Sequence, residues 1–314
     1  MRVRNGEKLV CTETRMKRNK KSEISRDIGL EIGSICGRYF FDMQHLHYGY
    51  WTEDLAVNIS NLHAAQANYA KFVSSHIPDG VKTILDIGCG TGQMAKDLQD
   101  MGYTVDCISP NAFFAEKARK LLGEQSRVFE CAFQDFENHG TYDLVMFCES
   151  FQYIGAPDAI GKSFGLMKDG GHLLICDYFA RPLEGKSMLA GGEKWTRFSD
   201  VIVTYPLQQL ADIDITDAMA PTLDIVDDVF REAVQPTVNL AIKLVASRYP
   251  WPYRLVQRIY RRRIEKIKGK YFSGRMTGEN FKKYKSYRLL LYRKNIDGES
   301  TVRADLPEQS GACV

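Results

Sequence analysis

The segment VKTILDIGCGTG, residues 81–92, decides the fold of this chain. It consists of an apolar run that reaches Asp86, glycines at the alternate positions 88, 90 and 92, and the beginning of a helical pattern. Glycine is required where the chain turns sharply off a strand and where a ligand approaches the backbone without a Cβ in between. The segment therefore predicts a buried strand, a tight turn beside a ligand and a helix. A purely structural turn is the alternative for a single GxGxG.

Short apolar runs alternate with helical patterns after this segment. The predicted strands cover residues 83–87, 104–108, 127–132, 142–148 and 172–178. The helical patterns between them include residues 92–101 and 111–122. Strands that are buried on both faces have continuous apolar sequences, and parallel neighbours require crossover helices. The alternation therefore predicts an α/β fold with a mainly parallel sheet that is covered by helices on both faces.

Further helical patterns flank this core. Two precede it, at residues 28–41 and 54–76; residues 201–217 predict a helix and a short strand, residues 221–268 are helical in pattern, and residues 287–292 predict the last strand. The helical region is therefore a cap inserted before the last strand. We divide the chain into a disordered basic tail (1–26), N-terminal cap helices (27–78), a cofactor-binding core (79–180), a substrate cap with the final strands (181–294) and a second disordered tail (295–314).

The composition indicates a soluble globular protein. The 314 residues are 44% hydrophobic and 26% charged, with a net charge of +3. We find no apolar window of 18 residues, and the basic N-terminus is not followed by an apolar segment, so we expect neither a membrane span nor a secretion signal. The eight cysteines form no CxxC pair. We therefore expect a cytoplasmic protein with reduced cysteines and no metal site.

Positive charge is concentrated near the two ends of the chain. Residues 1–26 carry nine Lys and Arg against three acids, and residues 248–294 carry sixteen against two. Residues 254–268 form an amphipathic helix with a cationic face. Three interpretations remain open: a solvated face of a cap helix, contact with an anionic membrane surface or a lipid-like substrate, and binding to RNA. The second would make the protein a peripheral membrane protein.

The glycine-rich turn resembles motif I of the class I S-adenosylmethionine-dependent methyltransferases. Four further segments match this family in order and spacing: residues 132–136, 142–145, 149–153 and 166–173. The resemblance extends over about residues 40–180 and is to the small-molecule type, including the tocopherol, ubiquinone-biosynthesis and cyclopropane-fatty-acid methyltransferases. It implies a Rossmann-like, doubly wound sheet of seven strands and S-adenosylmethionine as the cofactor.

The resemblance also implies which residues hold the cofactor. Gly88 and Gly90 would let its amino-acid and ribose portions lie against the loop, and Asp86 would orient the loop amides or reach the ammonium group. Asp135 would accept a hydrogen bond from the adenine amino group, beside Phe136. The remaining implied contacts are Cys89, Gly92, Ser109, Pro110, Gln134 and Cys148.

One position departs from the family pattern. The family usually supplies an acid after the second strand that binds both ribose hydroxyls, and this chain has Ser109. Asp106 lies three residues earlier, so on a strand it should point to the opposite face. A serine bonds one hydroxyl, which predicts either altered ribose contacts or weakened affinity.

An aromatic segment precedes the core. Residues 40–51 resemble the hxGYW segment of several small-molecule methyltransferases, and aromatic faces suit a sulfonium cation. Tyr48, Tyr50 and Trp51 would then cover the cofactor; the alternative is that they pack against helices.

Methyl transfer from a sulfonium is an in-line displacement that requires mainly alignment in a dry site. His47 and Glu149 are candidate general bases for an acceptor that must lose a proton, although each is also a candidate structural residue. Glu149, Tyr153 and Tyr178 are candidate substrate contacts at the carboxyl ends of the strands.

The sequence thus supports a methyltransferase that acts on oxygen, nitrogen or carbon of a small, apolar or lipid-like metabolite. The alternatives are a catalytically inactive S-adenosylmethionine-binding protein and an NAD(P)-dependent oxidoreductase, which the GxGxG spacing disfavours. Nucleic-acid substrates are not expected, because the fourth strand is followed by residues 148–151, CESF, instead of a (D/N)PPY motif. The sequence specifies neither the acceptor nor the oligomeric state.

Overall fold

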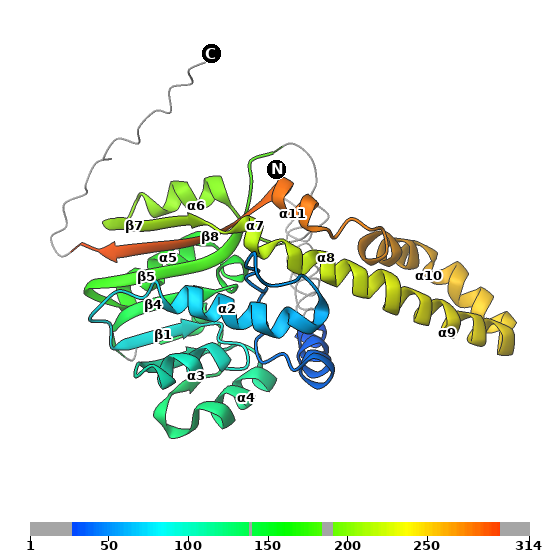
Figure 1. Cartoon of the computed structure of the whole chain (residues 1–314), viewed down its shortest axis with the longest axis horizontal. Helices are drawn as coiled ribbons and strands as arrows, with labels where there is room; N and C mark the ends of the chain where they lie inside the picture. Colours follow the sequence, from blue (N-terminus) through cyan, green and yellow to red (C-terminus); the bar gives the residue numbers. More distant parts are fainter. Residues whose placement is uncertain (1–26, 138–139, 184–190, 296–314) are drawn as a thin grey trace, which may run out of the picture.

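The computed structural model describes residues 27–137, 140–183 and 191–295. The predicted tails, residues 1–26 and nearly all of 295–314, lie outside the described residues. The described chain is built around one mainly parallel sheet, with helices on both faces and a long helical hairpin that extends to one side (Figure 1).

The sheet has the strand order β3-β2-β1-β4-β5-β8-β7, and the short β6 pairs with β5 beside this path. The strands are β1 (Thr83–Ile87), β2 (Thr104–Ile108), β3 (Val128–Phe129), β4 (Tyr142–Cys148), β5 (Met167–Ala180), β6 (Glu193–Lys194), β7 (Leu207–Asp214) and β8 (Lys285–Lys294). Only β8 runs against its neighbours β5 and β7; the other pairs are parallel. The predicted α/β class, mainly parallel sheet and insertion before the last strand are therefore confirmed, with β6 as an addition to the seven strands.

The predicted strand bounds at residues 83–87, 104–108 and 142–148 are those of the structure. The third strand is shorter than predicted: β3 covers only Val128–Phe129, and the chain then leads into the 3-10 turn η3 (Phe133–Asp135). The fifth strand is longer than predicted at both ends. In the 201–217 region the helix α6 (Trp195–Ile202) ends at its second residue, and the strand β7 occupies eight residues, Leu207–Asp214.

Helices cover both faces of the sheet, and strand residues alternate between the two cores. Ile84 packs on one face with α2 (Leu62–Ser74), α3 (Gln93–Asp100) and α4 (Ala112–Leu122). Leu85 packs on the other face with α5 (Ala156–Leu166) and α6. This alternation follows from the two-residue period of side chains on a strand.

A helix over residues 27–41 precedes the core, close to its predicted position. The second predicted N-terminal helix, residues 54–76, begins later than expected. Asn58 caps the short 3-10 turn η1 (Ile59–Asn61), and α2 follows it, so residues 54–58 are not helical. Sequence periodicity alone does not place such a start, because it is fixed by the local hydrogen bond of the Asn58 side chain.

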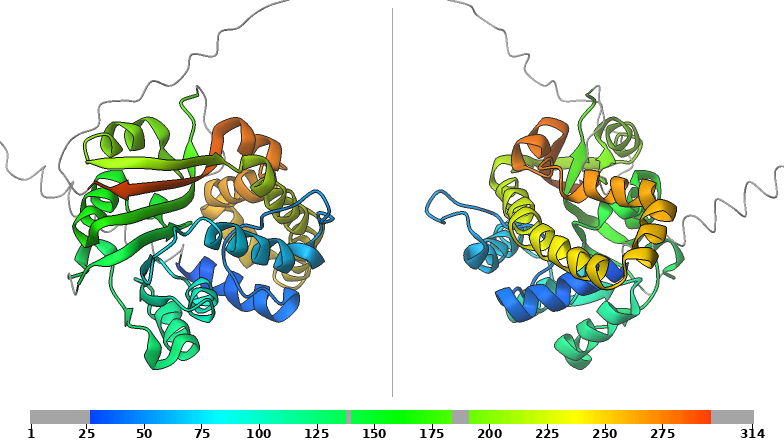
Figure 2. Two further views of the ribbon diagram at one scale, coloured as in Figure 1. Left: turned by 60° about the vertical axis from the view of Figure 1, so that its left-hand side comes forward. Right: turned by 90° about the vertical axis from the view of Figure 1, so that its right-hand side faces the viewer.

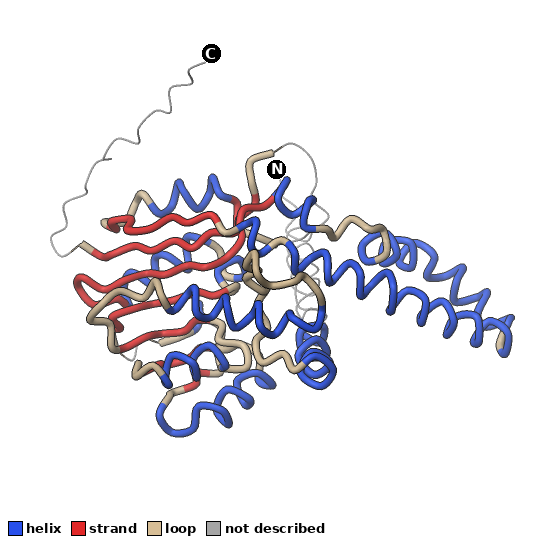
Figure 3. The backbone as a smooth tube through the Cα atoms, viewed as in Figure 1, coloured by secondary structure: helices blue, strands red, loops and turns tan. Residues whose placement is uncertain are grey.

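The insertion before β8 is helical, as predicted. It contains α7 (Thr216–Met219), α8 (Pro221–Asp228), the π-helical turn η5 (Val229–Val234), α9 (Gln235–Arg248), α10 (Pro250–Tyr271) and α11 (Gly278–Tyr284). Helices α7, α8 and α11 pack on the core, whereas α9 and α10 run beside each other away from the sheet (Figure 3). None of the helices in the described residues is long and apolar enough to cross a membrane.

Candidate functional site

A cavity of about 500 Å³ lies at the carboxyl ends of β1, β2 and β4. This is the point at which the strand order changes direction, because β1 lies between β2 and β4. Ligands of open parallel sheets bind at such a switch point, and the volume lies in the range of small-molecule sites. The lining residues are Asp27, Leu30, 45–47, 86–91, Gln93, Met94, 108–111, Phe114, 132–134, 148–150, Tyr153 and Ile154.

The glycine turn after β1 forms one wall, and its glycines have different roles. Gly88, Cys89 and Gly90 line the cavity. Gly88 has a φ of 81°, and a Cβ on it would lie 2.4 Å from Cβ of Ser150, so it allows the loop after β4 to approach. Gly92 lies outside the lining; a Cβ on it would lie 3.0 Å from Ala118 of α4. The structure therefore gives Gly92 a packing role against α4, and its contact with the cofactor stays a prediction.

Asp86, at the end of β1, places a carboxylate against the cavity. It is buried, and its Oδ2 has no hydrogen-bond partner among the described residues. Burial raises the pKa of Asp86 to about 7. An unpaired buried carboxylate oxygen beside a cavity fits a ligand that carries a positive charge.

The end of β2 contributes a serine, as the sequence indicated. Ser109 and Pro110 line the cavity, and the Ser109 hydroxyl lies 3.5 Å from the Asn111 carbonyl oxygen. Asp106 points away: Arg127 pairs with it at 2.5 Å, and the Tyr142 hydroxyl donates to it at 2.9 Å. The prediction that Asp106 lies on the opposite face is confirmed, so β2 supplies no carboxylate to the described lining.

The loop after β3 meets the cavity with one of its three expected residues. Ala132, Phe133 and Gln134 line it, whereas Asp135 is exposed and lies outside the lining. Phe136 is buried in the sheet core, where its ring packs 5.0 Å from that of Phe129. The η3 turn therefore brings Gln134 to the cavity and leaves Asp135 and Phe136 outside its lining, and the contacts of these three residues with the cofactor stay predictions.

The N-terminal segment covers the cavity with residues that precede the predicted aromatic ones. His45, Leu46 and His47 line it. The Trp51 indole donates to the Thr222 hydroxyl at 3.0 Å, and the Tyr50 ring stacks on Phe72.

Tyr48 packs against Tyr178 and Tyr287 and lies outside the lining. Tyr48, Tyr50 and Trp51 therefore pack against other residues of the chain, as the alternative interpretation expected, and their contact with the cofactor stays a prediction.

The His47 ring is buried and keeps an unpaired nitrogen. Its Nδ1 lies 2.8 Å from the Tyr48 carbonyl oxygen, which only accepts, so Nδ1 carries the proton and Nε2 is the free acceptor. Nε2 has no partner among the described residues. Burial, together with the neighbouring His45, lowers the pKa of His47 to about 3. His47 is therefore neutral at physiological pH.

Glu149 follows β4 and lines the same cavity. Its φ of 57° is unusual for a residue other than glycine and turns the chain at the strand end. Its Oε1 accepts hydrogen bonds from the Tyr48 backbone N–H at 2.7 Å and from the Tyr287 hydroxyl at 2.9 Å. Burial outweighs these bonds and raises the pKa of Glu149 to about 8. Cys148, the preceding residue, also lines the cavity.

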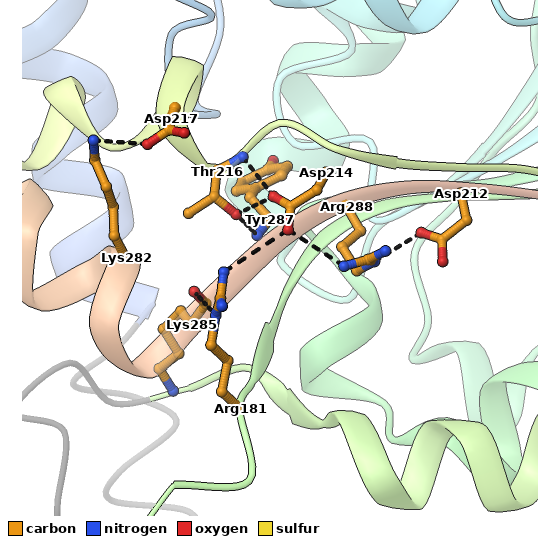
Figure 4. A network of polar contacts seen from close by, with 9 residues as sticks. All are labelled: Arg181, Asp212, Asp214, Thr216, Asp217, Lys282, Lys285, Tyr287 and Arg288. Carbon is orange, nitrogen blue, oxygen red and sulfur yellow. Dashed lines mark hydrogen bonds and ion pairs between the residues drawn. The ribbon is translucent and has the colours of Figure 1, made fainter. Parts of the chain in front are cut away.

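Tyr287 is a partner of Glu149 that the sequence did not reveal. It belongs to β8, and its backbone N–H donates to the Thr216 hydroxyl at 2.8 Å. Figure 4 shows that this part of β8 is fixed by ion pairs, in which Arg288 joins Asp212 at 2.7 Å and Asp214 at 3.3 Å. The cap region thus holds the hydroxyl that orients Glu149.

The two tyrosines predicted as substrate contacts differ. Tyr153 lines the cavity and is more than half exposed. Tyr178 lies outside the lining, where its ring stacks on that of Tyr48 at 6.2 Å, and its contact with a substrate stays a prediction. Six of the lining residues that sequence reasoning missed are Asp27, Leu30, His45, Leu46, Asn111 and Phe133.

Asp27 and Leu30 belong to the N-terminal helix. Asn111 donates to Glu31 of that helix at 3.0 Å, and Lys117 donates to Ser34 at 3.2 Å. The sequence predicts this helix but carries no signal that it covers the cavity.

A family model described as a methyltransferase domain matches residues 61–213. A putative methyltransferase of Geobacillus sp. (strain WCH70) is 29% identical over 142 residues, which are 42% of this chain and 57% of that protein. The ubiquinone biosynthesis O-methyltransferase of Vibrio parahaemolyticus is 34% identical over 103 residues, 30% of this chain and 43% of that protein. The chain thus spans about half the length of these two curated relatives.

Solved structures share the fold at low identity. Geranyl diphosphate C-methyltransferase from Streptomyces coelicolor, bound to S-adenosyl-L-homocysteine, has a TM-score of 0.59 and 15% identity over 83% of this chain and 92% of that chain. The [4+2]-cyclase SpnF has a TM-score of 0.57 and 16% identity over 81% of this chain and 88% of that chain.

Proposed function

We propose that this chain, which carries a methyltransferase domain of the S-adenosylmethionine-dependent class, transfers a methyl group to an oxygen, nitrogen or carbon atom of a small, apolar or lipid-like molecule. The observation that carries the proposal is the cavity at the switch point, with the glycine turn on one side and the unpaired carboxylate oxygen of Asp86 against it. When bound there, S-adenosylmethionine supplies an activated methyl group and leaves as a neutral thioether.

The lining fits this cofactor. Asp86 would pair with its ammonium group, because this oxygen is buried and unpaired. Ser109 would bond one ribose hydroxyl, and Phe133 would offer an apolar wall next to Gln134. Gly90 would leave the backbone open to the ligand.

A second carboxyl group of the cavity, that of Glu149, suits removal of a proton from an acceptor. Its pKa of about 8 makes it a stronger base than an ordinary carboxylate once it is ionised. The Tyr287 hydroxyl and the Tyr48 N–H fix its Oε1. His47, with a free Nε2, is the second candidate base, although its low pKa makes it weak.

An apolar acceptor is supported by the lining and by the names of similar proteins. Leu30, Leu46, Met94, Phe114 and Ile154 contribute apolar side chains. Geranyl diphosphate and ubiquinone appear in the names of a structural neighbour and a curated relative.

A second candidate is a protein that binds S-adenosylmethionine without methyl transfer. Ser109 in place of an acid favours it, and one solved structure of this fold is a cyclase. The fold alone therefore does not establish turnover.

Calorimetry with S-adenosylmethionine, S-adenosylhomocysteine and NAD tests the binding step. We expect both adenosyl ligands to bind and NAD not to bind. The cofactor assignment would be refuted if NAD bound, or if neither adenosyl ligand bound. Small molecules that co-purify with the protein, identified by mass spectrometry, then serve as acceptors in a methyl-transfer assay. A methylated product supports the enzyme, whereas binding without product for every co-purified molecule supports the inactive binder.

A further inference from the structure

The hairpin of α9 and α10, residues 235–271, stands apart from the rest of the molecule. Figure 1 shows that it extends away from the sheet and its covering helices. The structure describes all of α9, and none of its 14 residues is buried. The hairpin therefore exposes most of its side chains instead of packing them into the core of the molecule.

Much of the exposed surface is apolar. Leu240 and Leu244 on α9 are each 67% exposed, and Trp251, in the first turn of α10 at the tip, is 73% exposed. Other exposed apolar side chains of the hairpin are Val238, Val245, Tyr249, Leu255, Val256, Ile259, Tyr260 and Ile267. Eleven exposed apolar side chains on one two-helix element indicate an interaction site, because such residues normally occur singly on a protein surface.

The same hairpin is strongly basic. Residues 235–271 contain ten Lys and Arg against the single acid Glu265, which pairs with Arg261 at 3.0 Å. On α10 the helical spacing places Val256, Ile259 and Ile267 on one side and Arg254, Arg258 and Arg261 on the other. Apolar and cationic surfaces therefore run in parallel along the helix.

We propose that this hairpin binds an anionic lipid bilayer. Trp251 and the aliphatic side chains would enter the boundary between headgroups and acyl chains, and the cations would face the lipid phosphates. Tryptophan is enriched at that depth because its ring is apolar and its N–H is polar.

Charge complementarity selects the bilayer among the candidate occupants. Pairing with the hairpin of a second copy would bring ten cations against ten, and the segment 1–26 is itself basic, with nine Lys and Arg against three acids. Nucleic acid matches the charge, but it offers no apolar phase for the exposed leucines. A bilayer with anionic headgroups offers both.

The cavity is covered by a helix that lies on the same side of the molecule as the hairpin. The N-terminal helix, residues 27–41, contributes Asp27 and Leu30 to the lining and exposes Ile32, Tyr39 and Phe40. Figure 2 places this helix, in blue, on the side of the body from which the hairpin extends. The bilayer would thus lie on the side on which this helix covers the cavity.

Co-sedimentation of the full chain with vesicles tests the proposal without reference to enzyme activity. The vesicles contain phosphatidylcholine alone or with 30 mol% phosphatidylglycerol, at rising salt concentration. We expect binding only to the anionic vesicles, weakening with salt because the charges are screened. Arg258→Gln/Arg262→Gln should weaken it about 30-fold, since each cation near the surface contributes about 1 kcal/mol, roughly a fivefold factor.

Two further variants separate the outcomes. Trp251→Ala should weaken vesicle binding several-fold, whereas the matched double change Arg119→Gln/Lys120→Gln on α4, which removes the same charge elsewhere, should leave it unchanged. The proposal is overturned if anionic vesicles do not bind, or if the α4 variant loses as much as the hairpin variant. It is also overturned if Trp251→Ala acts only by converting a dimer to a monomer in light scattering, or if single-stranded RNA binds tightly while vesicles do not.

Discussion

Replacing Asp86 by asparagine separates its proposed ligand contact from its role in the fold. The carboxylate is buried, and its pKa of about 7 means that ionisation is penalised in the folded protein. A ligand ammonium would remove that penalty by pairing with the unpaired Oδ2. A charge-assisted hydrogen bond of this kind contributes about 1.5–3 kcal/mol, so Asp86→Asn should weaken S-adenosylhomocysteine binding roughly 10- to 150-fold at pH 8.

The pH dependence of ligand binding is a second test of the contact between Asp86 and the ligand. The ligand α-amino group is charged below about pH 8, while Asp86 loses its charge below about pH 7. The wild-type dissociation constant should therefore rise about tenfold per unit as the pH falls from 7 to 5, so that wild type and variant converge near pH 5. In the variant the dissociation constant should be flat over that range. Isothermal titration calorimetry at several pH values measures both.

The substitution Asp86→Asn should raise the free energy of unfolding, although it lowers the affinity for the ligand. Because the folded pKa of Asp86 is raised, the folded state holds a proton that the unfolded chain releases between about pH 4 and 7, so the aspartate costs stability as the pH rises. A shift from 3.8 to about 7 corresponds to an upper limit of about 4 kcal/mol. Urea denaturation should show Asp86→Asn to be more stable than wild type at pH 8, and equal to it near pH 4.

Asp106→Asn is the matched control. This acid is also buried, on the neighbouring strand, but it pairs with Arg127 and Tyr142 on the other face of the sheet. The control should lose stability and keep full affinity for S-adenosylhomocysteine. Wild-type affinity in Asp86→Asn at pH 8, or a pH slope that persists in it, would refute the ligand contact.

Three further predictions test other parts of the site. Glu149→Gln should lower the rate of methyl transfer to an ionisable acceptor by about 10²- to 10⁴-fold, and it should remove the rise in rate as the pH approaches 8; an unchanged pH–rate profile excludes Glu149 as the base. Gly88→Ala should destabilise the fold more than Gly90→Ala in thermal or urea unfolding, because its Cβ would lie 2.4 Å from a side chain of the β4 loop, whereas that of residue 90 would lie 3.3 Å from the end of a flexible leucine. The reverse order would contradict the geometry of the turn. Asp135→Asn should leave S-adenosylhomocysteine affinity within about twofold of wild type by calorimetry, since this residue lies outside the cavity lining; a tenfold loss would restore the adenine contact that the motif suggested.

The alternation of strands and helices was readable from the sequence because burial imposes it locally. Residues 83–87, 104–108 and 142–148 are mainly apolar runs, each with a single aspartate, and the structure gives them the same bounds. The glycine turn was equally readable, since the backbone at Gly88 and Gly90 has positive φ values that other residues adopt at a cost. These features depend on a few adjacent residues and on no distant partner.

The membership of the site was decided by the tertiary structure. Whether residue 134 or residue 135 faces the cavity depends on the rotation of a single 3-10 turn, and motif spacing does not resolve a rotation of that size. In the aromatic segment, Leu46 and His47 point into the cavity, whereas Trp51 turns towards Thr222, which lies 171 residues later in the chain.

Tyr287 shows the same limit most clearly, because it reaches Glu149 across 138 residues of sequence. The sequence by itself determined the sheet, the turn and the place along the chain where a ligand would bind, since these follow from local burial and backbone freedom. Only the folded chain decided which side chains surround the ligand, because a side chain's direction is set by packing against residues that are distant in sequence and near in space.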